Sequence, residues 1–453
     1  MADKAMKKIC FVLPEYSRKP GGGTKVVFEY ANILAAAGCK VTICFWPRIS
    51  LKQYHMPEFV RRVLCRVFTA VYPKWFPLDR SIKKRCVFGI SDSTIPNGTD
   101  IVATAVETAK PVAQLSPEKG SKHYLIQGFE LWNTPEAEVR STYRMGMSNI
   151  VISDWLAELV RNEAPADPNL IKDWVDEGTF YPEHDVTRHK NEVAVLYHVD
   201  KHKGFCDLFE ALKTVKAKYP ELVVNAFGTP PRPNLFPDWI RYTQAATPEQ
   251  LREIYSRSLV FACATINEGF GLTLPESMFC GCALVATKFQ GVWEYASEDC
   301  ALLSNVGDSE ELAGNILRLL NDPDFAGELA NKGRQHAMSE CSREKAEEAI
   351  KREFGVGGRV SMQLDSKTLI SVIIPAYQAE GTIERAISSA LAIPYDAIEA
   401  IVVDDGSTDG TAGILEAFTA GNHRVRILRQ EDQDRSSQGT GAFPSPGAKG
   451  VCS

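Results

Sequence analysis

The stretch KICFVLPEYSRKPGGGTKVVFEYANILAAAGCKVTICF, residues 8–45, decides the fold of the first part of the chain. It opens with residues 8–13, an almost wholly apolar run that predicts a buried strand. Residues 26–34 then carry apolar side chains at helical spacing, and Gly38 ends this pattern. A second apolar run, residues 40–45, predicts the next strand. The order strand, glycine loop, helix, strand predicts a βαβ unit with parallel strands.

The same alternation of strand and helix patterns continues as far as residue 354. In the first half, we expect further strands at residues 101–105, 123–127 and 149–153. In the second half, we expect strands at 193–198, 222–227, 259–264 and 283–286, and helices at 205–218, 248–256, 274–280, 309–320 and 342–354. Two successive sets of alternating strands and helices predict two doubly wound α/β domains.

A third α/β pattern follows a glycine-rich segment. Residues 369–377 predict a strand, residues 382–391 a helix, and residues 399–403 a strand that runs into the sequence DDGSTDG. From residue 433 onward, Ser, Gly and Pro dominate without strand or helix periodicity. We therefore expect a domain at 1–185, a second domain at 186–354, a linker at 355–368, a partial α/β fragment at 369–430 and an irregular tail at 431–453.

The composition excludes several classes of protein. With 44% hydrophobic and 24% charged residues, the 453-residue chain is neither a coiled coil, nor collagen-like, nor wholly disordered. It contains no apolar run of about 18 residues that would predict a membrane-spanning helix, and its N-terminus shows no signal-peptide pattern. The net charge of −6 argues against nucleic acid as a partner. Twelve scattered cysteines without a CxxC pair predict a reduced, cytoplasmic protein.

One basic segment, residues 52–85, stands out in this acidic chain. Within it, apolar residues recur at helical spacing with arginines between them: Phe59, Val60, Val63, Leu64, Val67, Phe68 and Val71. Such a segment is typical of peripheral contact with an anionic membrane or of binding to a lipid diphosphate. The alternative is an ordinary packed helix with a solvated basic face.

Two glycine-containing stretches indicate where an anionic ligand could bind. The stretch GGGT, residues 21–24, lies between a strand and a helix, where backbone N–H groups can approach an anion. It can equally be a flexible loop with a capping threonine.

The stretch NEGFGLTLPESM, residues 267–278, carries Glu268 and Glu276, separated by seven residues. Carboxylates suit vicinal sugar hydroxyls, and the N–H groups of residues 270–272 at a helix start suit a diphosphate.

Residues 267–278 resemble the E-x7-E motif of family 4 glycosyltransferases, with its usual E-G-F-G-L-x-x-x-E surroundings. The resemblance covers roughly residues 8–354 and implies the GT-B fold, in which two Rossmann-like domains face each other and the second binds the nucleotide-sugar donor. It implies a catalytic place beside the transferred sugar for Glu268 and a ribose-binding role for Glu276. It also implies that Lys203, a lysine before a glycine, neutralises the donor diphosphate. The other donor-binding residues that it implies are Gly22, Gly23, His198, Gly269, Phe270, Gly271 and Leu272.

The chain departs from the family pattern at the end of the first strand of the second domain. Where the family usually has a Gly-Arg pair, this sequence places His198, so more of the diphosphate charge falls on Lys203. His198 would help to neutralise the diphosphate only when protonated, and plain packing at the strand end is an equal alternative role.

On the acceptor side, Gln127 and Glu130 follow a strand at its carboxyl end, where active sites of α/β proteins lie. His123, at the start of that strand, is expected to be structural.

The third pattern resembles the nucleotide-binding start of family 2 glycosyltransferases, which have the GT-A fold. The resemblance implies that four residues meet a nucleotide: Pro375, Tyr377, Asp404 and Asp405. A whole domain of that kind needs roughly another hundred residues, and a divalent metal is expected only for the complete domain. We therefore expect this fragment to be inactive, with an unpaired sheet edge on its Asp404 side. We expect the tail to come from a reading-frame change, with truncation as the rival explanation.

Together the resemblances imply an enzyme, a hexosyltransferase-type glycosyltransferase. It would move a sugar from a nucleotide-sugar donor to a saccharide or lipid-linked acceptor, with retention of configuration and without a metal in its first two domains. Two fused transferases suggest bacterial surface polysaccharide biosynthesis, in the cytoplasm or at the inner face of the membrane. Two other classes remain open: a nucleotide-sugar epimerase of GT-B fold, and a nucleotide-sugar-binding protein without turnover. The E-G-F-G-L string favours transfer.

Overall fold

The computed structural model describes residues 6–131, 134–356, 370–391, 398–422 and 424–429. The chain divides into two compact units, residues 1–357 and 358–453. The predicted linker from residue 357 onward and the predicted tail 431–453 lie outside the described residues. No described helix has both the length and the apolarity that crossing a membrane requires.

The first unit begins with seven parallel strands in the order β3-β2-β1-β4-β5-β6-β7. They are β1 (Lys8–Leu13), β2 (Lys40–Phe45), β3 (Lys83–Cys86), β4 (Asp100–Ala103), β5 (Ser121–Ile126), β6 (Ser148–Val151) and β7 (Asn169–Leu170). In the register, Phe11 of β1 lies opposite Ile43 of β2 and Val102 of β4, and all three side chains are buried. Because helices cover both faces of such a sheet, its inner strands are continuous apolar runs.

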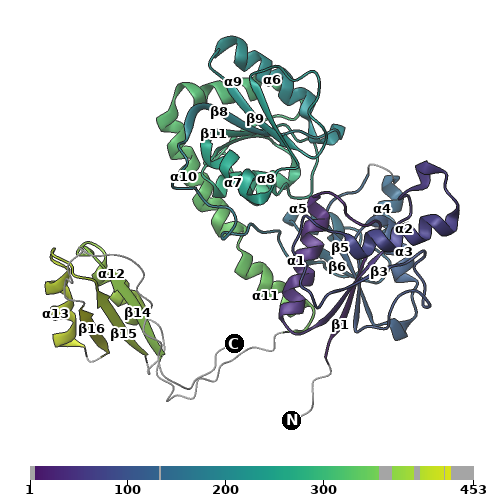
Figure 1. The fold of residues 1–453 in the computed structure, drawn as a ribbon, viewed down its shortest axis with the longest axis horizontal. Helices are drawn as coiled ribbons and strands as arrows, with labels where there is room; N and C mark the ends of the chain where they lie inside the picture. The colour runs from purple at the N-terminus through teal and green to yellow at the C-terminus, as the bar shows by residue number, and fades with distance from the viewer. Residues whose placement is uncertain (1–5, 132–133, 357–369, 392–397, 423, 430–453) are drawn as a thin grey trace. The chain divides into compact units, whose positions relative to one another are not determined.

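Five α-helices accompany this sheet (Figure 1): α1 (Gly22–Ala36), α2 (Glu58–Val71), α3 (Val106–Ala113), α4 (Glu136–Thr142) and α5 (Asp154–Arg161). Helix α1 begins directly after the first residue of the glycine loop. It buries Val27, Tyr30 and Leu34, which lie on one face at helical spacing. The βαβ unit expected from residues 8–45 is therefore present.

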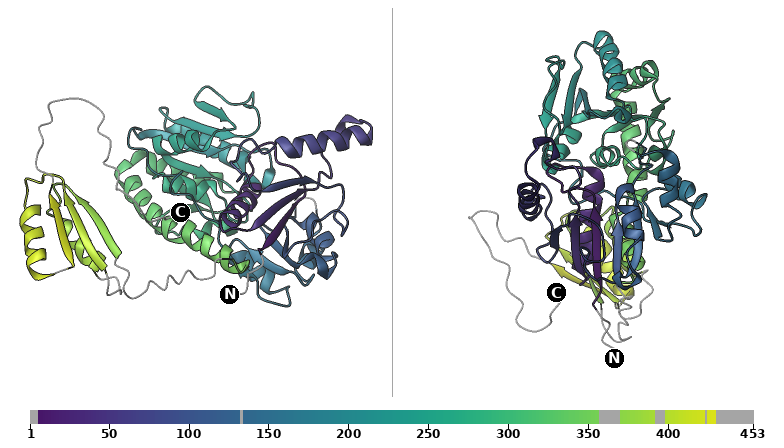
Figure 2. Two further views of the ribbon diagram at one scale, coloured as in Figure 1. Left: turned by 60° about the horizontal axis from the view of Figure 1, so that its bottom comes forward. Right: turned by 90° about the vertical axis from the view of Figure 1, so that its right-hand side faces the viewer.

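Helix α2 packs inward through a face of mixed polarity. Arg61, Cys65 and Thr69 are buried, and Arg61 donates hydrogen bonds to Glu58 and to the C=O of Pro47. Four apolar residues of the helix form an outward stripe and are 44–72% exposed: Phe59, Val63, Val67 and Val71. Two others, Leu64 and Phe68, pack against the core, while Arg62 and Arg66 are exposed, so the helix also has the solvated basic face of the alternative interpretation. The helix projects as the purple segment at the upper right of the left panel of Figure 2.

A second sheet of six parallel strands follows, in the order β10-β9-β8-β11-β12-β13. Its strands are β8 (His189–Leu196), β9 (Val223–Gly228), β10 (Ile240–Gln244), β11 (Ser258–Cys263), β12 (Ala283–Thr287) and β13 (Leu302–Ser304). The helices around it are α6 (Phe205–Lys218), α7 (Pro248–Arg257), α8 (Thr273–Phe279), α9 (Ser309–Asn321) and α10 (Pro323–Glu340). Two parallel sheets with intervening helices confirm the α/β class.

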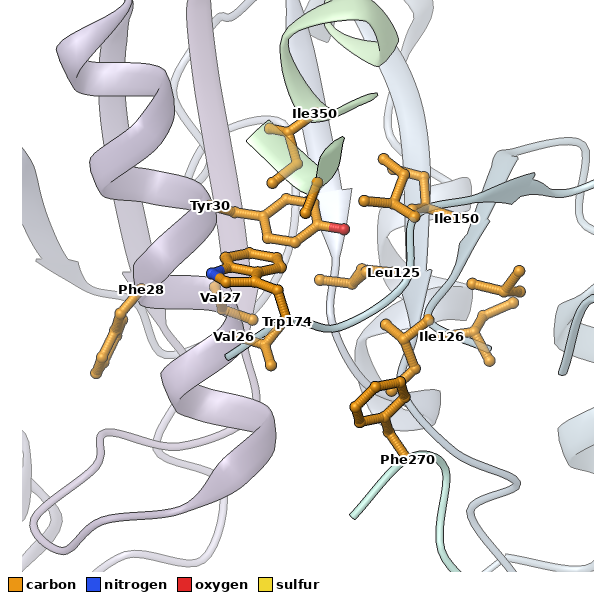
Figure 3. Close-up of a cluster of buried hydrophobic side chains, with 14 of the residues drawn as sticks. Val26, Val27, Phe28, Tyr30, Leu125, Ile126, Ile150, Trp174, Phe270 and Ile350 are labelled. Carbon is orange, nitrogen blue, oxygen red and sulfur yellow. The ribbon is translucent and has the colours of Figure 1, made fainter. Parts of the chain in front are cut away.

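The last helix of the first unit, α11 (Arg343–Glu353), returns to the first sheet. Ile350 lies beside Tyr30 of α1 in one buried cluster (Figure 3). The ring centroid of Phe354, directly after the helix, lies 6.4 Å from that of Phe11 in β1. The first domain therefore takes part of its core from the far end of the unit.

His123 fixes α11 to the sheet through two carboxylates. Its Nδ1 lies 3.1 Å from Oε1 of Glu353, and its Nε2 lies 3.1 Å from Oδ1 of Asp100. Burial acts to lower the pKa of His123, but the two carboxylates outweigh burial and raise it. His123 thus has a structural place at the start of β5, far from the carboxyl ends of the strands.

The second unit contains β14 (Ile370–Ala376), α12 (Ile383–Leu391), β15 (Ile398–Asp404), α13 (Thr411–Gly421) and β16 (Val425–Arg429). Its described strands form a parallel sheet in the order β14-β15-β16. Strand β15, which ends in Asp404, is therefore the middle strand, and the expected unpaired edge beside Asp404 is wrong. The outer strands of the described sheet are β14 and β16.

Candidate active site

A cleft of about 1060 Å³ opens at the carboxyl ends of the strands of the first sheet. One wall includes the ends of β1, β4 and β5 and the glycine loop: Leu13, Pro14, Thr104, Ala105, Gln127, Gly128, Glu130 and Gly21–Thr24. The other wall comes from two loops of the second domain: His202, Lys203, Asn267, Glu268 and Gly269. Parallel strands end at a common edge, so the topology itself brings these loops together.

The glycine loop allows the second domain and β5 to come close to α1. A Cβ atom on Gly23 would lie 3.2 Å from Oε1 of Gln127, and one on Gly22 would lie 3.9 Å from Cδ1 of Leu272. Within the described part of the chain, the buried Oε1 of Gln127 has no hydrogen-bond partner. Buried polar atoms are normally paired, so this oxygen is a candidate ligand contact.

Glu130 lines the cleft and also supports a helix. Its Oε2 accepts a hydrogen bond of 2.9 Å from the N–H of Val106, the first residue of α3. Burial raises the pKa of Glu130 to about 7, although the hydrogen bond from Val106 acts in the opposite direction. Capping α3 accounts for the place of this carboxylate in the fold.

On the opposite wall, Lys203 and Glu268 form an ion pair between Nζ and Oε1. Both side chains are partly buried, at 17% and 24% exposure, so they face the cleft without being fully solvated. The N–H of Ile266 donates a hydrogen bond of 2.8 Å to the C=O of His202. This bond ties the loop that carries Glu268 to the turn that carries Lys203.

Gly204 explains why a glycine must follow Lys203. Lys203 ends the short 3₁₀ turn η3 (Lys201–Lys203), and Gly204 turns the chain into α6 with a φ of +64°. A Cβ atom here would lie 1.7 Å from the carbonyl oxygen of Ala264. Only glycine satisfies both the left-handed backbone and the close approach.

The loop between Glu268 and α8 presents unpaired N–H groups. Among the described residues, the N–H groups of Phe270, Gly271 and Leu272 donate to no protein acceptor. The hydroxyl of Tyr295 donates to the C=O of Phe270 at 2.9 Å and fixes the loop. In Figure 3, Phe270 packs beside Ile126 at the end of β5. Unpaired N–H groups held in a rigid loop are suited to phosphate oxygens.

Glu276 is buried on α8 and meets a lysine from the other domain. Its Oε1 accepts a hydrogen bond of 2.9 Å from Nζ of Lys25, on α1. Lys25 is not among the residues predicted from the sequence, because 251 positions separate it from Glu276 and no local pattern links the two.

His198 is a poor replacement for an arginine. Its Nδ1 accepts a hydrogen bond of 3.1 Å from the N–H of Asp200, so in the neutral ring the proton lies on Nε2. Burial lowers the pKa of His198, and the charges of Lys203 and His202 act in the same direction, against Asp200. The ring therefore takes up a proton less readily than a free histidine and is better suited to offer a hydrogen bond than a charge.

Further contacts join the two domains beside the cleft. Nε1 of Trp155 donates to the C=O of Gly269 at 2.8 Å. A Cβ atom on Gly269 would lie 2.0 Å from the carbonyl oxygen of Gln127, so the two backbones touch. Oε1 of Glu294 accepts from the N–H of Asp154 at 2.7 Å. Neither Trp155 nor Glu294 is among the site residues predicted from the sequence.

In the second unit, the four predicted nucleotide residues lie at the carboxyl ends of β14 and β15. Pro375 pairs in register with Val403, beside Asp404. Oδ1 of Asp404 accepts a hydrogen bond of 3.1 Å from the N–H of Ser407. Tyr377 is exposed, and the N–H of Asp405 donates to the C=O of Ala376, which joins the two strand ends.

Two family models match the chain in succession. Residues 180–336 match glycosyl transferases group 1, and residues 371–439 match glycosyl transferase family 2. The first match contains Lys203, Glu268 and Glu276. The second contains the four predicted nucleotide residues of the second unit.

Relatives with curated descriptions match shorter parts. The glycosyltransferase GlyG of Streptococcus pneumoniae is 40% identical over 70 residues, which are 16% of this chain and 23% of GlyG. The phosphatidyl-myo-inositol mannosyltransferase of Propionibacterium freudenreichii is 30% identical over 125 residues, which are 27% of this chain and 32% of that protein. The chain spans less than a third of the length of the curated relatives named here.

Solved structures match over more of the chain. Sucrose-phosphate synthase from Thermosynechococcus elongatus has a TM-score of 0.58 at 19% identity, over 77% of this chain and 98% of that one. TarM from S. aureus has a TM-score of 0.60 at 11% identity, over 77% and 100%. HepE from Anabaena has a TM-score of 0.57 at 13% identity, over 77% and 99%. Because the sequence identities are only 11–19%, these similarities show the fold and nothing about the substrates.

The first unit has the GT-B fold of the solved structures that it resembles. Two segments of the chain match glycosyltransferase family models: residues 180–336 match glycosyl transferases group 1, and residues 371–439 match glycosyl transferase family 2.

Proposed function

We propose that the first unit transfers a sugar from a nucleotide-sugar donor to a saccharide or lipid-linked acceptor in the synthesis of a bacterial surface polysaccharide. The observation that carries this proposal is the placement of Lys203 and Glu268 together on one wall of the cleft, opposite Gln127. A charged pair at the junction of two Rossmann-like domains suits a reaction in which a diphosphate leaves and a hydroxyl attacks.

On the donor side, Glu276 binds the ribose hydroxyls, and Lys203 with the N–H groups of residues 270–272 binds the diphosphate. These groups take the negative charge that grows on the leaving diphosphate, so the first unit uses no metal for this purpose. His198 contributes a neutral hydrogen bond from Nε2. The donor pocket thus combines carboxylates for hydroxyls with cationic and N–H groups for phosphates.

On the acceptor side, Gln127 and Glu130 line the opposite wall, and Glu268 lies beside the transferred sugar. The unpaired Oε1 of Gln127 supports a contact with an acceptor hydroxyl. The reaction retains the configuration of the transferred sugar, as in the family that the sequence resembles. The enzyme acts mainly by holding the two substrates together and stabilising the departing charge.

A panel of nucleoside diphosphates tests the donor site. UDP comes first, because the TarM and HepE structures contain it, and GDP and ADP follow. A ligand at 100 times its Kd should stabilise the protein by about 2.7 kcal/mol in a thermal-shift experiment. Glu276→Ala should weaken the binding roughly 10- to 100-fold, since it removes a charged hydrogen-bond acceptor. The control is Glu298→Ala, in an exposed pair with Lys288, which should bind normally.

The same preparation separates the competing functions. Transfer of the sugar to an acceptor, or hydrolysis of the donor that Glu268→Ala abolishes, supports a transferase. Release of an epimerised nucleotide sugar would indicate an epimerase, and binding without any product would indicate a binding protein. Failure of the wild-type protein to bind any of the nucleotides would contradict the proposal.

We also propose that α2 rests on the anionic inner face of the membrane, where a lipid-linked acceptor would be found. Its outward stripe of Phe59, Val63, Val67 and Val71 is flanked by Arg62 and Arg66. Apolar side chains that enter the bilayer and arginines that meet anionic headgroups are the two features of interfacial binding.

In the second unit, the proposed nucleotide contacts are those of Pro375, Tyr377, Asp404 and Asp405, and a divalent metal belongs only to a complete GT-A domain.

Liposome flotation tests the role of α2. The wild-type protein should float with vesicles that contain anionic phosphatidylglycerol at low salt, and less at high salt because salt screens the arginines. The double variant Val63→Asp, Val67→Asp should lose at least tenfold in binding, since each charge would have to enter the interface. Leu235→Asp, which changes an exposed apolar residue of the second domain, is the control. Equal flotation of both variants would contradict the proposal.

A further inference from the structure

The contact between Lys25 and Glu276 joins the two domains at the proposed ribose site. Nζ of Lys25 lies 2.9 Å from Oε1 of Glu276, with the lysine side chain 30% exposed and the glutamate side chain 7% exposed. Lys25 lies one residue after the glycine loop, on α1, and Glu276 lies on α8. The ion pair therefore connects the glycine loop of one domain to the glutamate motif of the other.

Glu276 depends on Lys25 for its charge partner. Among the described residues, Lys25 is the one cation that lies within 4.0 Å of this carboxylate. Burying a carboxylate without a cation or a hydrogen-bond donor is costly, so the ion pair with Lys25 stabilises the Glu276 side chain in its buried position.

Lys25 in turn interacts mainly with Glu276. Burial acts to lower the pKa of Lys25, but the charge and hydrogen bond of Glu276, together with the charges of Glu29 and Asp173, outweigh burial and raise it. The nearby Asp173 is fully buried, which raises its pKa to about 8 although the charge of Lys25 acts in the opposite direction. Nζ also lies 5.6 Å from the ring centroid of Phe180, which further restrains the lysine.

We propose that Lys25 is a donor-positioning residue: from the first domain, it holds the Glu276 carboxylate in place to receive the vicinal hydroxyls of a nucleoside diphosphate. The inference rests on the proposed function, because it assigns the partner of the same ribose site. An ionised carboxylate offers about four acceptor positions. Lys25 occupies one at Oε1, and the others remain for the ribose. Ribose recognition thus uses one residue from each domain, and it couples donor binding to the apposition of the two domains.

The test compares a ribonucleoside diphosphate with its 2′,3′-dideoxy analogue, using UDP, GDP or ADP, whichever stabilises the wild-type protein. Lys25→Met should raise the Kd of the ribonucleotide about tenfold and leave that of the analogue within twofold, so the preference for ribose shrinks. Lys25→Arg should restore most of the preference. In a Glu276→Gln background, Lys25→Met should have no further effect, because Lys25 acts through Glu276.

A matched lysine controls for the loss of an interdomain ion pair. Nζ of Lys172 lies 2.7 Å from Asp154 and 3.1 Å from Glu294 of the second domain, away from Glu276. Lys172→Met should leave the ribose preference unchanged. If Lys25→Met lowers the yield of folded protein, Lys25→Gln is used instead, and the Kd of the ribonucleotide is again compared with that of the dideoxy analogue.

The possible outcomes separate this inference from the function on which it rests. An unchanged ribose preference in Lys25→Met, together with nucleotide binding that Glu276→Ala weakens, overturns the role of Lys25 and leaves the donor site standing. The absence of nucleotide binding by the wild-type protein overturns both.

Discussion

Glu268→Ala should lower the rate of sugar transfer at least about 100-fold while the thermal stability stays within a few degrees of the wild type. Glu268 lines the cleft, pairs with Lys203 and is partly solvated, so its removal changes the charge of the site more than the packing of the core. Losing one preorganised electrostatic contact to the reacting groups costs about 10²–10³ in turnover in comparable sites. The measurement is kcat with the donor saturating, alongside the Kd of the nucleoside diphosphate.

A split between turnover and binding distinguishes this role from a general loss of the site. We expect the Kd of the nucleotide to change less than tenfold in Glu268→Ala, because the proposed ribose contact at Glu276 remains. Glu210→Ala, which breaks an exposed ion pair with Lys213 on α6, is the matched control and should be fully active. Turnover above a tenth of the wild-type rate in Glu268→Ala would remove Glu268 from the reaction.

Gly204→Ala should destabilise the first unit by about 3–5 kcal/mol and lower the Tm by roughly 10 °C. The added Cβ atom would lie 1.7 Å from the carbonyl oxygen of Ala264, a backbone atom of the loop after β11 that cannot rotate away. The φ of +64° adds the strain of a left-handed residue, roughly 1–2 kcal/mol. The chain can accommodate the methyl group only if the turn that carries Lys203 moves.

Gly314→Ala should have the opposite effect on the stability of the same domain. Gly314 lies within α9, and nothing lies within 4 Å of a Cβ atom placed on it. Replacing a helical glycine by alanine should therefore stabilise the domain by up to about 1 kcal/mol. Equal thermal midpoints for Gly204→Ala and the wild type in scanning calorimetry would contradict the close approach at Gly204.

The sequence predicts the regular elements well where apolar periodicity or capping residues are strong. The expected helix at 205–218 has the bounds of α6, and the expected strand at 8–13 those of β1. Helix α10 was missed because its buried positions are mostly small residues, Ala326, Ala330, Gly333 and Ala337, which give little hydrophobic signal. The sequence Asp322–Pro323 could have indicated the start of this helix, because Asp322 accepts a hydrogen bond of 3.0 Å from the N–H of Phe325 as its N-cap.

The site was predicted only within single motifs. Glu268 and Glu276 share one stretch of chain, so their spacing is visible in the sequence, and Lys203 was reached through the family resemblance. Lys25 owes its importance to an approach between two domains, which no local pattern encodes. The orientation of α2 could not be predicted either, because the helix carries both apolar and basic residues along its length. The structure packs Arg61, Leu64 and Phe68 inward and leaves Phe59, Val63 and Val67 exposed.

The return of α11 to the first sheet has a consequence for how the chain folds during synthesis. Ile350 and Phe354 complete the core around Tyr30 and Phe11, yet they follow the whole second domain. At a translation rate of about 5–20 residues per second, the first sheet waits roughly 10–30 seconds for its last helix. During that time the surface under α11 is uncovered and open to chaperones. A first domain made without residues 343–354 would keep this surface uncovered, so we expect the first domain to depend on the end of the unit for a complete core.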